Sequence, residues 1–266
     1  MASESQILKR LAEQGINAVI LTGPRIVGQD HEISMGAMPA ALKGRLWMGG
    51  RGKTLVDLGP VIGGLQGVQL GTNRHRDLLR SVVSQTNKLA GQYKLGNYAL
   101  YCGGISRAED LPRWAKLVRT VRDVGGRPAL YAATPALRKV DQASRAALFQ
   151  PLDTLIVSGE AGVLALADEF KKDAPNKTLA LRVWHPDAYA LGFYCWGIGA
   201  DGAYLEWIFP NEPLFNAFWF DGRALLTPTA RWDFEPTLGL LRAAQGISDY
   251  YLAQRCEALA ASARQR

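Results

Sequence analysis

The chain has 266 residues, 48% hydrophobic and 21% charged, which fits a globular protein with a large core. Its 31 Lys and Arg exceed its 24 Asp and Glu and give a formal charge of +7. The basic residues are scattered along the chain, so a one-faced nucleic-acid footprint is not indicated. No apolar run approaches the roughly 20 residues of a membrane span. We therefore expect neither a nucleic-acid nor a membrane partner.

Three cysteines, Cys102, Cys195 and Cys256, are far apart and include no CxxC pair. This spacing supports neither a disulfide framework nor a zinc site, so buried free thiols are expected. The three histidines lack a ligand spacing as well, and no metal is predicted.

The N-terminal segment predicts a polar amphipathic helix over residues 3–14, followed by a strand over 17–21. Gly15 between them is a typical helix stop. The helix lacks the character of a signal peptide. A chain that begins with a helix followed directly by a strand starts in the middle of a repeating strand–helix pattern. This is expected of a domain cut from a longer protein with additional domains upstream. The cellular compartment is left open.

Short apolar runs alternate with helical patterns over most of the chain, which is typical of parallel βαβ units. Fully apolar runs fit a sheet covered on both faces. Their number predicts a single domain over residues 1–266, a (β/α)8 TIM barrel that is complete or lacks its N-terminal part; a doubly wound open parallel sheet is the alternative. The predicted strands are 18–21, 54–57, 67–70, 98–101, 128–131, 154–157, 178–181 and 203–207, and the predicted helices 77–95, 111–124, 136–149 and 161–173.

Two glycine motifs resemble nucleotide sites but lack the required context. Gly197 to Gly202 satisfies GxGxxG, yet it follows a helical stretch and opens a strand. Gly50 to Thr54 imitates the end of a P-loop, yet a strand follows it instead of a helix. No cofactor is therefore expected. The segment from Ile26 to Gly52 has no clear period and predicts a long loop, of the kind that builds the active-site face of barrel enzymes.

Aromatic residues concentrate between residues 184 and 220, where the last strands would form the mouth of a barrel. Aromatic faces suit the apolar C–H faces of sugar rings, and ring N–H and O–H groups can bond to hydroxyls. Packing under a long loop would explain any one of these residues equally well. Trp207, at the predicted end of a strand, is the strongest candidate for a ligand contact. The candidate sugar-binding residues are Trp207, Trp184, Trp196, Tyr204 and His185.

A series of motifs closes the chain. A helix with Trp196 leads into a strand at Gly199, Asp201-Gly202, Leu205 and Trp207; Asp221-Gly222 and Thr227-Pro228 follow, and the last helix carries Arg242, Gly246, Asp249-Tyr250 and Leu252. Over residues 190–260 this series resembles the C-terminal portion of glycoside hydrolase family 123 barrels. Most matched positions suit structural roles, such as helix packing at Gly246, so the resemblance supports a fold more than an activity.

The resemblance implies retaining hydrolysis of β-linked N-acetylgalactosamine, in which the substrate acetamide attacks with help from an adjacent Asp-Glu pair. In that family the pair sits just after a mid-barrel strand. Here the corresponding strand is 98–102, and Gly103-Gly104 follows it. Glu109-Asp110 comes later, in reverse order, where acidic residues favour a helix start. The missing pair counts against hydrolysis by the family's mechanism.

Other carboxylates at predicted strand ends could serve catalysis. Glu160 follows the strand 154–157, the place where barrel enzymes put general acids, and Asp57 or Asp187 would be its partner. Strand alternation points Glu206 towards the helices if Trp207 faces the mouth. The sequence thus predicts a glycoside hydrolase-like barrel that binds an oligosaccharide or other glycan, with catalysis left open. The alternatives are a non-catalytic scaffold or pseudoenzyme, and a barrel enzyme acting on a small acidic metabolite.

Overall fold

The computed structural model describes residues 9, 11–16, 20–28, 30–45, 53–65, 67–184, 186–205, 226–228 and 234–264. The chain forms two compact units. The central unit comprises Asn17–Thr178, and the terminal unit comprises Met1–Ile16 together with Leu179–Arg266.

Parallel strands form the core of the central unit. They lie in the order β1 (Ile20–Leu21), β4 (Thr54–Asp57), β5 (Tyr98–Ile105), β6 (Pro128–Ala132) and β7 (Thr154–Ser158). Every residue of β6 and β7 is buried, as expected where both faces of a parallel sheet are covered. The apolar runs therefore predicted these strands well, although β5 continues further than expected.

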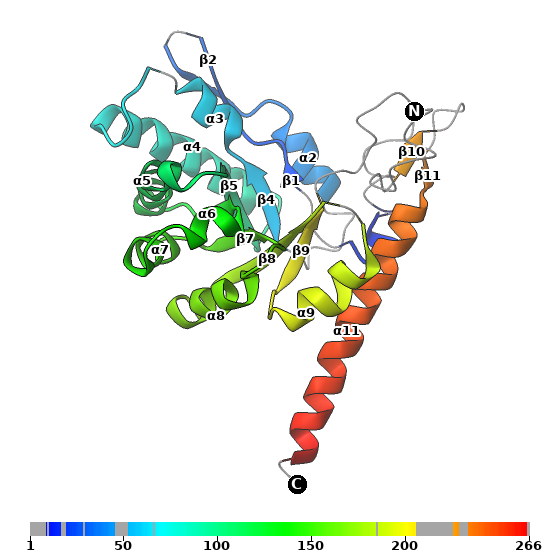
Figure 1. The fold of residues 1–266 in the computed structure, drawn as a ribbon. Helices are drawn as coiled ribbons and strands as arrows, with labels where there is room; N and C mark the ends of the chain where they lie inside the picture. Colours follow the sequence, from blue (N-terminus) through cyan, green and yellow to red (C-terminus); the bar gives the residue numbers. More distant parts are fainter. Residues whose placement is uncertain are drawn as a thin grey trace. The chain divides into compact units, whose positions relative to one another are not determined.

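Helices cover the sheet of the central unit in chain order. They are α4 (Asn73–Gln92), α5 (Leu111–Asp123), α6 (Thr134–Arg138), α7 (Gln142–Phe149) and α8 (Val163–Asp173). Figure 1 shows them beside one another along one face of the strands.

Local sequence explains where these helices begin and how they pack. The Thr72 hydroxyl accepts a hydrogen bond from the backbone N–H of His75 and caps α4. The rings of Phe149 in α7 and Phe170 in α8 pack edge to face, with their centroids 5.2 Å apart. One helix predicted over 136–149 is divided instead into α6 and α7. Asp141 accepts from the Ser144 N–H and starts α7 anew.

The loop predicted from Ile26 to Gly52 is a wrong prediction for its described residues. Strands β2 (Arg25–Val27) and β3 (Glu32–Ser34) form an antiparallel hairpin, and α2 (Met38–Arg45) follows. A three-residue strand and an eight-residue helix are too short to show a period in the sequence.

The strand predicted over 67–70 is also wrong, because these residues form turns. A short helix, α3 (Gly59–Gly64), fills most of the interval after β4, and Gly67 takes a φ of +90°. Parallel strands need a crossover of about a dozen residues or more, which this interval does not provide.

In the terminal unit, β8 (Thr178–Val183) pairs in parallel with β9 (Gly202–Leu205). Asp201 holds the start of this pair. Its backbone N–H donates to the carbonyl of Leu179, and its carboxylate accepts from the N–H of Leu179, both at 2.8 Å. Strands β10 (Leu226–Pro228) and β11 (Phe234–Pro236) form an antiparallel pair.

The closing helix α11 (Leu238–Arg264) packs on the π-helical segment η3 (Ala190–Tyr194). A Cβ at Gly246 would lie 2.7 Å from the carbonyl oxygen of Ala188, so only glycine permits this approach. The Tyr250 hydroxyl donates to the carbonyl of Ala200 at 2.7 Å. The close approach confirms the packing role expected of Gly246, and the Tyr250 hydrogen bond adds a second contact of α11.

The architecture is α/β with parallel strands covered by helices, and the described strands do not close into an eight-stranded barrel. Among the described residues, no helix is long and apolar enough to cross a membrane. Nor does the described part of the chain gather three or more His, Cys, Asp or Glu side chains that could hold a metal ion.

Candidate functional site

The carboxyl ends of parallel strands meet at one edge of a sheet, and there the central unit carries two of the candidate carboxylates. Asp57 is the last residue of β4 and is half-buried; its Oδ1 accepts from the N–H of Gly59 at 2.8 Å. Its register partner on β5 is Tyr101. Register partners project from the same face of a sheet, so Tyr101 is the neighbour of Asp57 there.

Asp57 also acts on a cysteine of the neighbouring strand. Burial raises the pKa of the Cys102 thiol to about 12; a backbone hydrogen bond from Ala129 opposes this rise, and the charge of Asp57 adds to it. A thiol with this pKa stays protonated at neutral pH and is a poor nucleophile. Cys102 and Cys195 are buried and free, as expected, whereas Cys256 is exposed, contrary to expectation.

Glu160 lies two residues beyond β7 and is exposed, and a chain of hydrogen bonds fixes its position. The Ser158 hydroxyl donates to its Oε2 at 2.9 Å. The backbone N–H of Thr134, at the start of α6, donates to that hydroxyl at 3.0 Å. Arg138 donates to the carbonyl of Ala161 at 3.2 Å and holds the loop. Glu160 is therefore a positioned carboxylate with access to solvent.

The third candidate carboxylate, Asp187, has a structural contact in the terminal unit. Its Oδ1 accepts from the N–H of Ala190 at 2.8 Å, at the start of the helical segment, and its side chain is exposed. This contact is typical of a helix cap. Asp57, Glu160 and Asp187 thus each have their own partners, and the described contacts do not pair one with another.

Gly103 and Gly104 occupy the place where the resemblance requires an acidic pair, and they lie inside β5, not after it. A Cβ at Gly103, whose φ is +117°, would lie 2.6 Å from Cη2 of Trp114. A Cβ at Gly104 would lie 2.7 Å from Cδ1 of Tyr131. Aromatic rings therefore fill the space that two acidic side chains would need. Glu109, further on, is exposed beside Arg107 at 4.0 Å.

Of the aromatic candidates, Trp184 has the most exposed ring among the described ones. It directly follows β8, its side chain is 52% exposed, and the guanidinium carbon of Arg182 lies 3.9 Å from its ring centroid. Arg182 is in register with Tyr204 of β9, which is half-buried. Trp184, Arg182 and Tyr204 thus form one aromatic–guanidinium group at the carboxyl end of β8, here called the Trp184 group.

The remaining aromatic candidates differ from it. Trp196 is 37% exposed, and its ring N–H donates to Glu257 of α11 at 3.1 Å. That bond uses the group which would otherwise meet a sugar hydroxyl. Trp207 and His185 lie outside the described residues.

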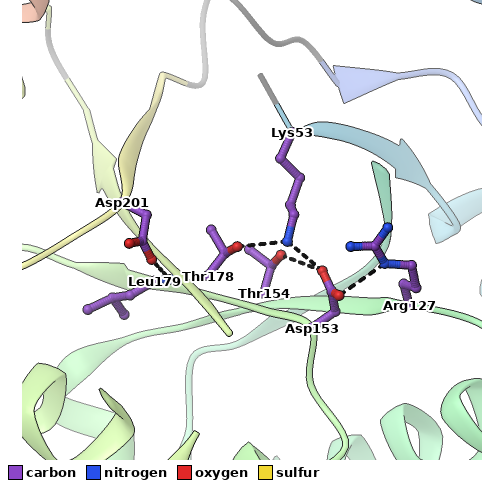
Figure 2. A network of polar contacts seen from close by, with 7 residues as sticks. All are labelled: Lys53, Arg127, Asp153, Thr154, Thr178, Leu179 and Asp201. Atoms are coloured by element: carbon purple, nitrogen blue, oxygen red, sulfur yellow. Dashed lines mark hydrogen bonds and ion pairs between the residues drawn. The ribbon is translucent and has the colours of Figure 1, made fainter. Parts of the chain in front are cut away.

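A charged group that was not predicted from the sequence lies at the opposite edge, where the strands begin. The strand-entry cluster consists of Lys53, Arg127, Asp153 and Lys177, which directly precede β4, β6, β7 and β8. Lys53 Nζ donates to Asp153 Oδ2 and to Thr178 Oγ1, both at 2.7 Å, and Arg127 Nε donates to Asp153 Oδ1 at 3.0 Å (Figure 2). A charged residue immediately before four of the apolar runs, those of β4, β6, β7 and β8, was the signal in the sequence.

The electrostatics of Asp153 follow from these contacts. Burial of Asp153 raises its pKa. The hydrogen bonds and positive charges of Lys53 and Arg127 lower the pKa by more, so it lies below the usual Asp value. Asp153 is therefore ionised at neutral pH. Figure 2 shows this network where the strands begin. Asp57 and Glu160 lie where β4 and β7 end.

Searches against known protein families and against curated proteins find no match. Among solved structures, the chain is similar to a family 123 glycoside hydrolase from Clostridium perfringens, with a TM-score of 0.65 and 12% identity over 97% of this chain and 56% of that one. This chain therefore spans only a little over half of that protein. The relationship is one of fold.

Two further similarities are weaker. An endo-beta-N-acetylglucosaminidase from Cordyceps militaris aligns with a TM-score of 0.42 and 8% identity over 94% of this chain and 97% of that one. A monomeric dihydrodipicolinate synthase variant aligns with a TM-score of 0.36 and 16% identity, covering 70% and 68% of the two chains. TM-scores this low carry no argument about fold or function.

Proposed function

We propose that this chain binds a carbohydrate at the carboxyl ends of its strands, with Trp184 as the platform for a sugar ring. The observation that carries the proposal is the Trp184 group. A largely exposed indole follows β8, with Arg182 against one ring face at 3.9 Å. A guanidinium on one face leaves the other available to the apolar C–H face of a sugar.

The neighbours of Trp184 suit hydroxyl recognition. Arg182 carries N–H donors in a planar fork, and Tyr204, its register partner, carries a hydroxyl that both donates and accepts. Sugar sites combine an apolar platform with a few such polar groups. The fold relationship to a glycoside hydrolase, and the motif resemblance over residues 190–260, support a glycan as the ligand class. A (β/α)8 barrel over residues 1–266 remains the fold we propose for this domain, with a doubly wound open parallel sheet as the alternative.

For catalysis we propose only candidate residues. Glu160 is our candidate general acid, since Ser158 fixes a solvent-accessible carboxylate after a strand end. Asp57 or Asp187 is its proposed partner, and neither is part of an adjacent Asp-Glu pair. The aromatic rings beside Gly103 and Gly104 favour a second candidate, a pseudoenzyme that binds a glycan without cleaving it.

Binding of N-acetylgalactosamine and of oligosaccharides that end in it, measured by calorimetry, tests the platform. Trp184→Ala is expected to weaken binding about tenfold or more, because the stacking surface is lost; tenfold corresponds to about 1.4 kcal/mol. Trp196→Phe is the matched control. It keeps an aromatic ring and removes the indole N–H, which already donates to Glu257, so sugar affinity should stay unchanged.

Two results would contradict this function. Equal affinity of Trp184→Ala and the parent chain would remove Trp184 from the site. Absence of binding across a panel of neutral and amino sugars would reject carbohydrate binding itself.

A further inference from the structure

The first turn of α4 contains a buried polar atom that has no partner. His75 is the third residue of this 20-residue helix, and only 3% of it is exposed. Its backbone N–H donates to the Thr72 hydroxyl. Its ring atom Nδ1 is buried, and within the part of the chain that the structure describes it has no hydrogen-bond partner. A buried ring nitrogen without a partner costs free energy, which a ligand atom at this point would recover.

An ammonium group from the neighbouring helix lies against the same turn. Nζ of Lys116, in α5, lies 2.8 Å from the position that a Cβ of Gly71 would take. Gly71 precedes His75 by four positions, and helical side chains lean back towards the N-terminus of their helix, so the His75 ring covers the turn that Lys116 reaches. Burial lowers the pKa of the His75 imidazole, and the charge of Lys116 lowers it further, in agreement with this proximity.

The backbone of this turn adds donors. The first intrahelical bond of α4 runs from the N–H of Arg76 to the carbonyl of Thr72. The N–H groups of Asn73 and Arg74 come before it, and no described residue accepts from them. The first turn contains no acidic residue. The positive end of the helix dipole is therefore left without a counter-charge from its own turn, which favours an anion.

Two exposed cations beside this turn keep their charge available. Nη2 of Arg74 lies 3.3 Å from Nδ1 of His31, in the turn between β2 and β3, so the arginine head is held by a neutral contact. Neither Arg74 nor Lys116 forms an ion pair with any residue that the structure describes. Asp77, the carboxylate in the next turn of α4, binds Arg80 at 2.6 Å.

We propose that the first turn of α4 binds a tetrahedral oxyanion such as phosphate, held by Lys116 Nζ, His75 Nδ1 and the N–H groups of Asn73 and Arg74. A neutral imidazole can carry its proton on Nδ1 and donate it to an oxyanion oxygen. The end of Lys116 covers this position, and an exposed lysine can lift to admit an ion and then bind it.

This α4 anion site lies wholly within the central unit and shares no residue with the carbohydrate contact assigned to Trp184. It gives the chain a second ligand class. The ligand is a free oxyanion or the phosphate group of an ester.

Calorimetric titration with inorganic phosphate, at an ionic strength held constant with sodium chloride, tests the site. Saturable binding is expected for the parent chain. Lys116→Met should weaken it at least tenfold, because the ammonium is lost while the apolar part of the side chain remains. Lys116 is exposed, so the variant is expected to fold, which circular dichroism checks.

Lys88→Met is the matched control, because it removes the same charge from an exposed lysine of the same helix, near its other end. It should bind phosphate like the parent. Equal losses in the two variants, or a phosphate response no larger than that of sodium chloride, would overturn the proposal.

The imidazole resonances of the histidines report where the ion binds. The His75 resonance, assigned by substituting each histidine in turn, should shift along the same saturation curve as the calorimetric heat. The shift should be lost in Lys116→Met. Saturable phosphate binding that leaves the His75 resonance unmoved would place the ion elsewhere and reject the α4 anion site.

Titrations with inorganic sulfate and with glucose 6-phosphate identify the source of the oxyanion. Binding of the ester as tight as that of inorganic phosphate indicates a phosphorylated ligand, and binding of the free ions alone indicates an ion site. Trp184→Ala should leave these affinities unchanged, so the failure of one proposal does not affect the other.

Discussion

Within the central unit, the edge where the parallel strands begin and the edge where they end carry charged side chains in different settings. At the first edge, Lys53 and Asp153 are nearly buried, with side-chain exposures of 16% and 11%, and join segments 100 residues apart. At the second, Asp57 is half-buried and Glu160 is exposed, and each accepts its described hydrogen bond from a residue two positions away.

The difference separates a stabilising use of charge from an available one. A buried carboxylate saturated by two cations holds strands together, and it has no lone pair directed at a ligand. A solvent-accessible carboxylate fixed by one hydroxyl can still accept a proton or a sugar hydroxyl. The same division is found in barrel enzymes, where the carboxyl ends of the strands carry catalysis and the amino ends carry stability.

The largest expected effect is on the buried ion pair. Asp153→Ala leaves Lys53 without its carboxylate in a nearly buried position, so the free energy of unfolding should fall by about 3–5 kcal/mol. Urea unfolding followed by circular dichroism measures it. Asp57→Ala, which removes a carboxylate with one backbone contact at the opposite edge, should cost only about 1 kcal/mol. Similar losses in the two variants would contradict the comparison.

A substitution in β5 should have the next largest effect. Gly103→Ala combines a φ of +117°, worth about 1–2 kcal/mol, with a clash against Trp114, worth about 1–3 kcal/mol. The same unfolding measurement applies. Gly125→Ala is the control for backbone strain alone, since Gly125 has a φ of +87° and open space around it. A loss no greater than that of the control would show that Trp114 moves aside readily, and that acidic residues could be accommodated here.

Acid should weaken the strand-entry edge in particular. Since Lys53 and Arg127 hold the pKa of Asp153 below its usual value despite burial, the unfolded chain binds more protons than the folded one near the unfolded Asp pKa of about 3.9. The stability from Asp153 is present above that pH and lost as pH falls through the folded-state pKa. Urea unfolding between pH 6 and pH 2.5 should show a steeper acid loss for the parent than for Asp153→Asn. Parallel curves would contradict this.

Local patterns predicted the strands of the central unit because apolar runs at the sheet become buried wherever they occur. β4, β6 and β7 match their predicted ranges to within one residue. Sequence patterns do not predict an element correctly when the element is too short to show a period, or when the topology of the sheet decides whether an apolar run can become a strand. The apolar run at 67–70 lies too close to β4 for a parallel crossover, and the hairpin β2–β3 is too brief to show a period.

The strand-end positions of Asp57 and Glu160 could be predicted because the place of a residue relative to a strand is a local property of the sequence. The strand-entry cluster was not found, because its pairs join residues 26 and 100 positions apart. Only the sheet brings such residues together. The stack of Arg182 on Trp184 is local, but it depends on strand alternation carrying both side chains to one face.

The smallest stability effect is expected at Glu160. Glu160→Gln keeps an oxygen that can accept from Ser158, and the residue is exposed, so the free energy of unfolding should change by no more than about 0.5 kcal/mol. If the chain cleaves aryl N-acetylgalactosaminides, this variant should lower kcat at least about a hundredfold and remove one limb of the pH–rate profile, as loss of a general acid does.

Ser158→Ala should lower kcat less, because the carboxylate remains but loses its fixed orientation. An unchanged pH–rate profile in Glu160→Gln would exclude Glu160 as the acid. A stability loss as large as that of Asp153→Ala would show instead that the carboxyl-end charges are structural too, and that the two edges do not differ in the way their burial indicates.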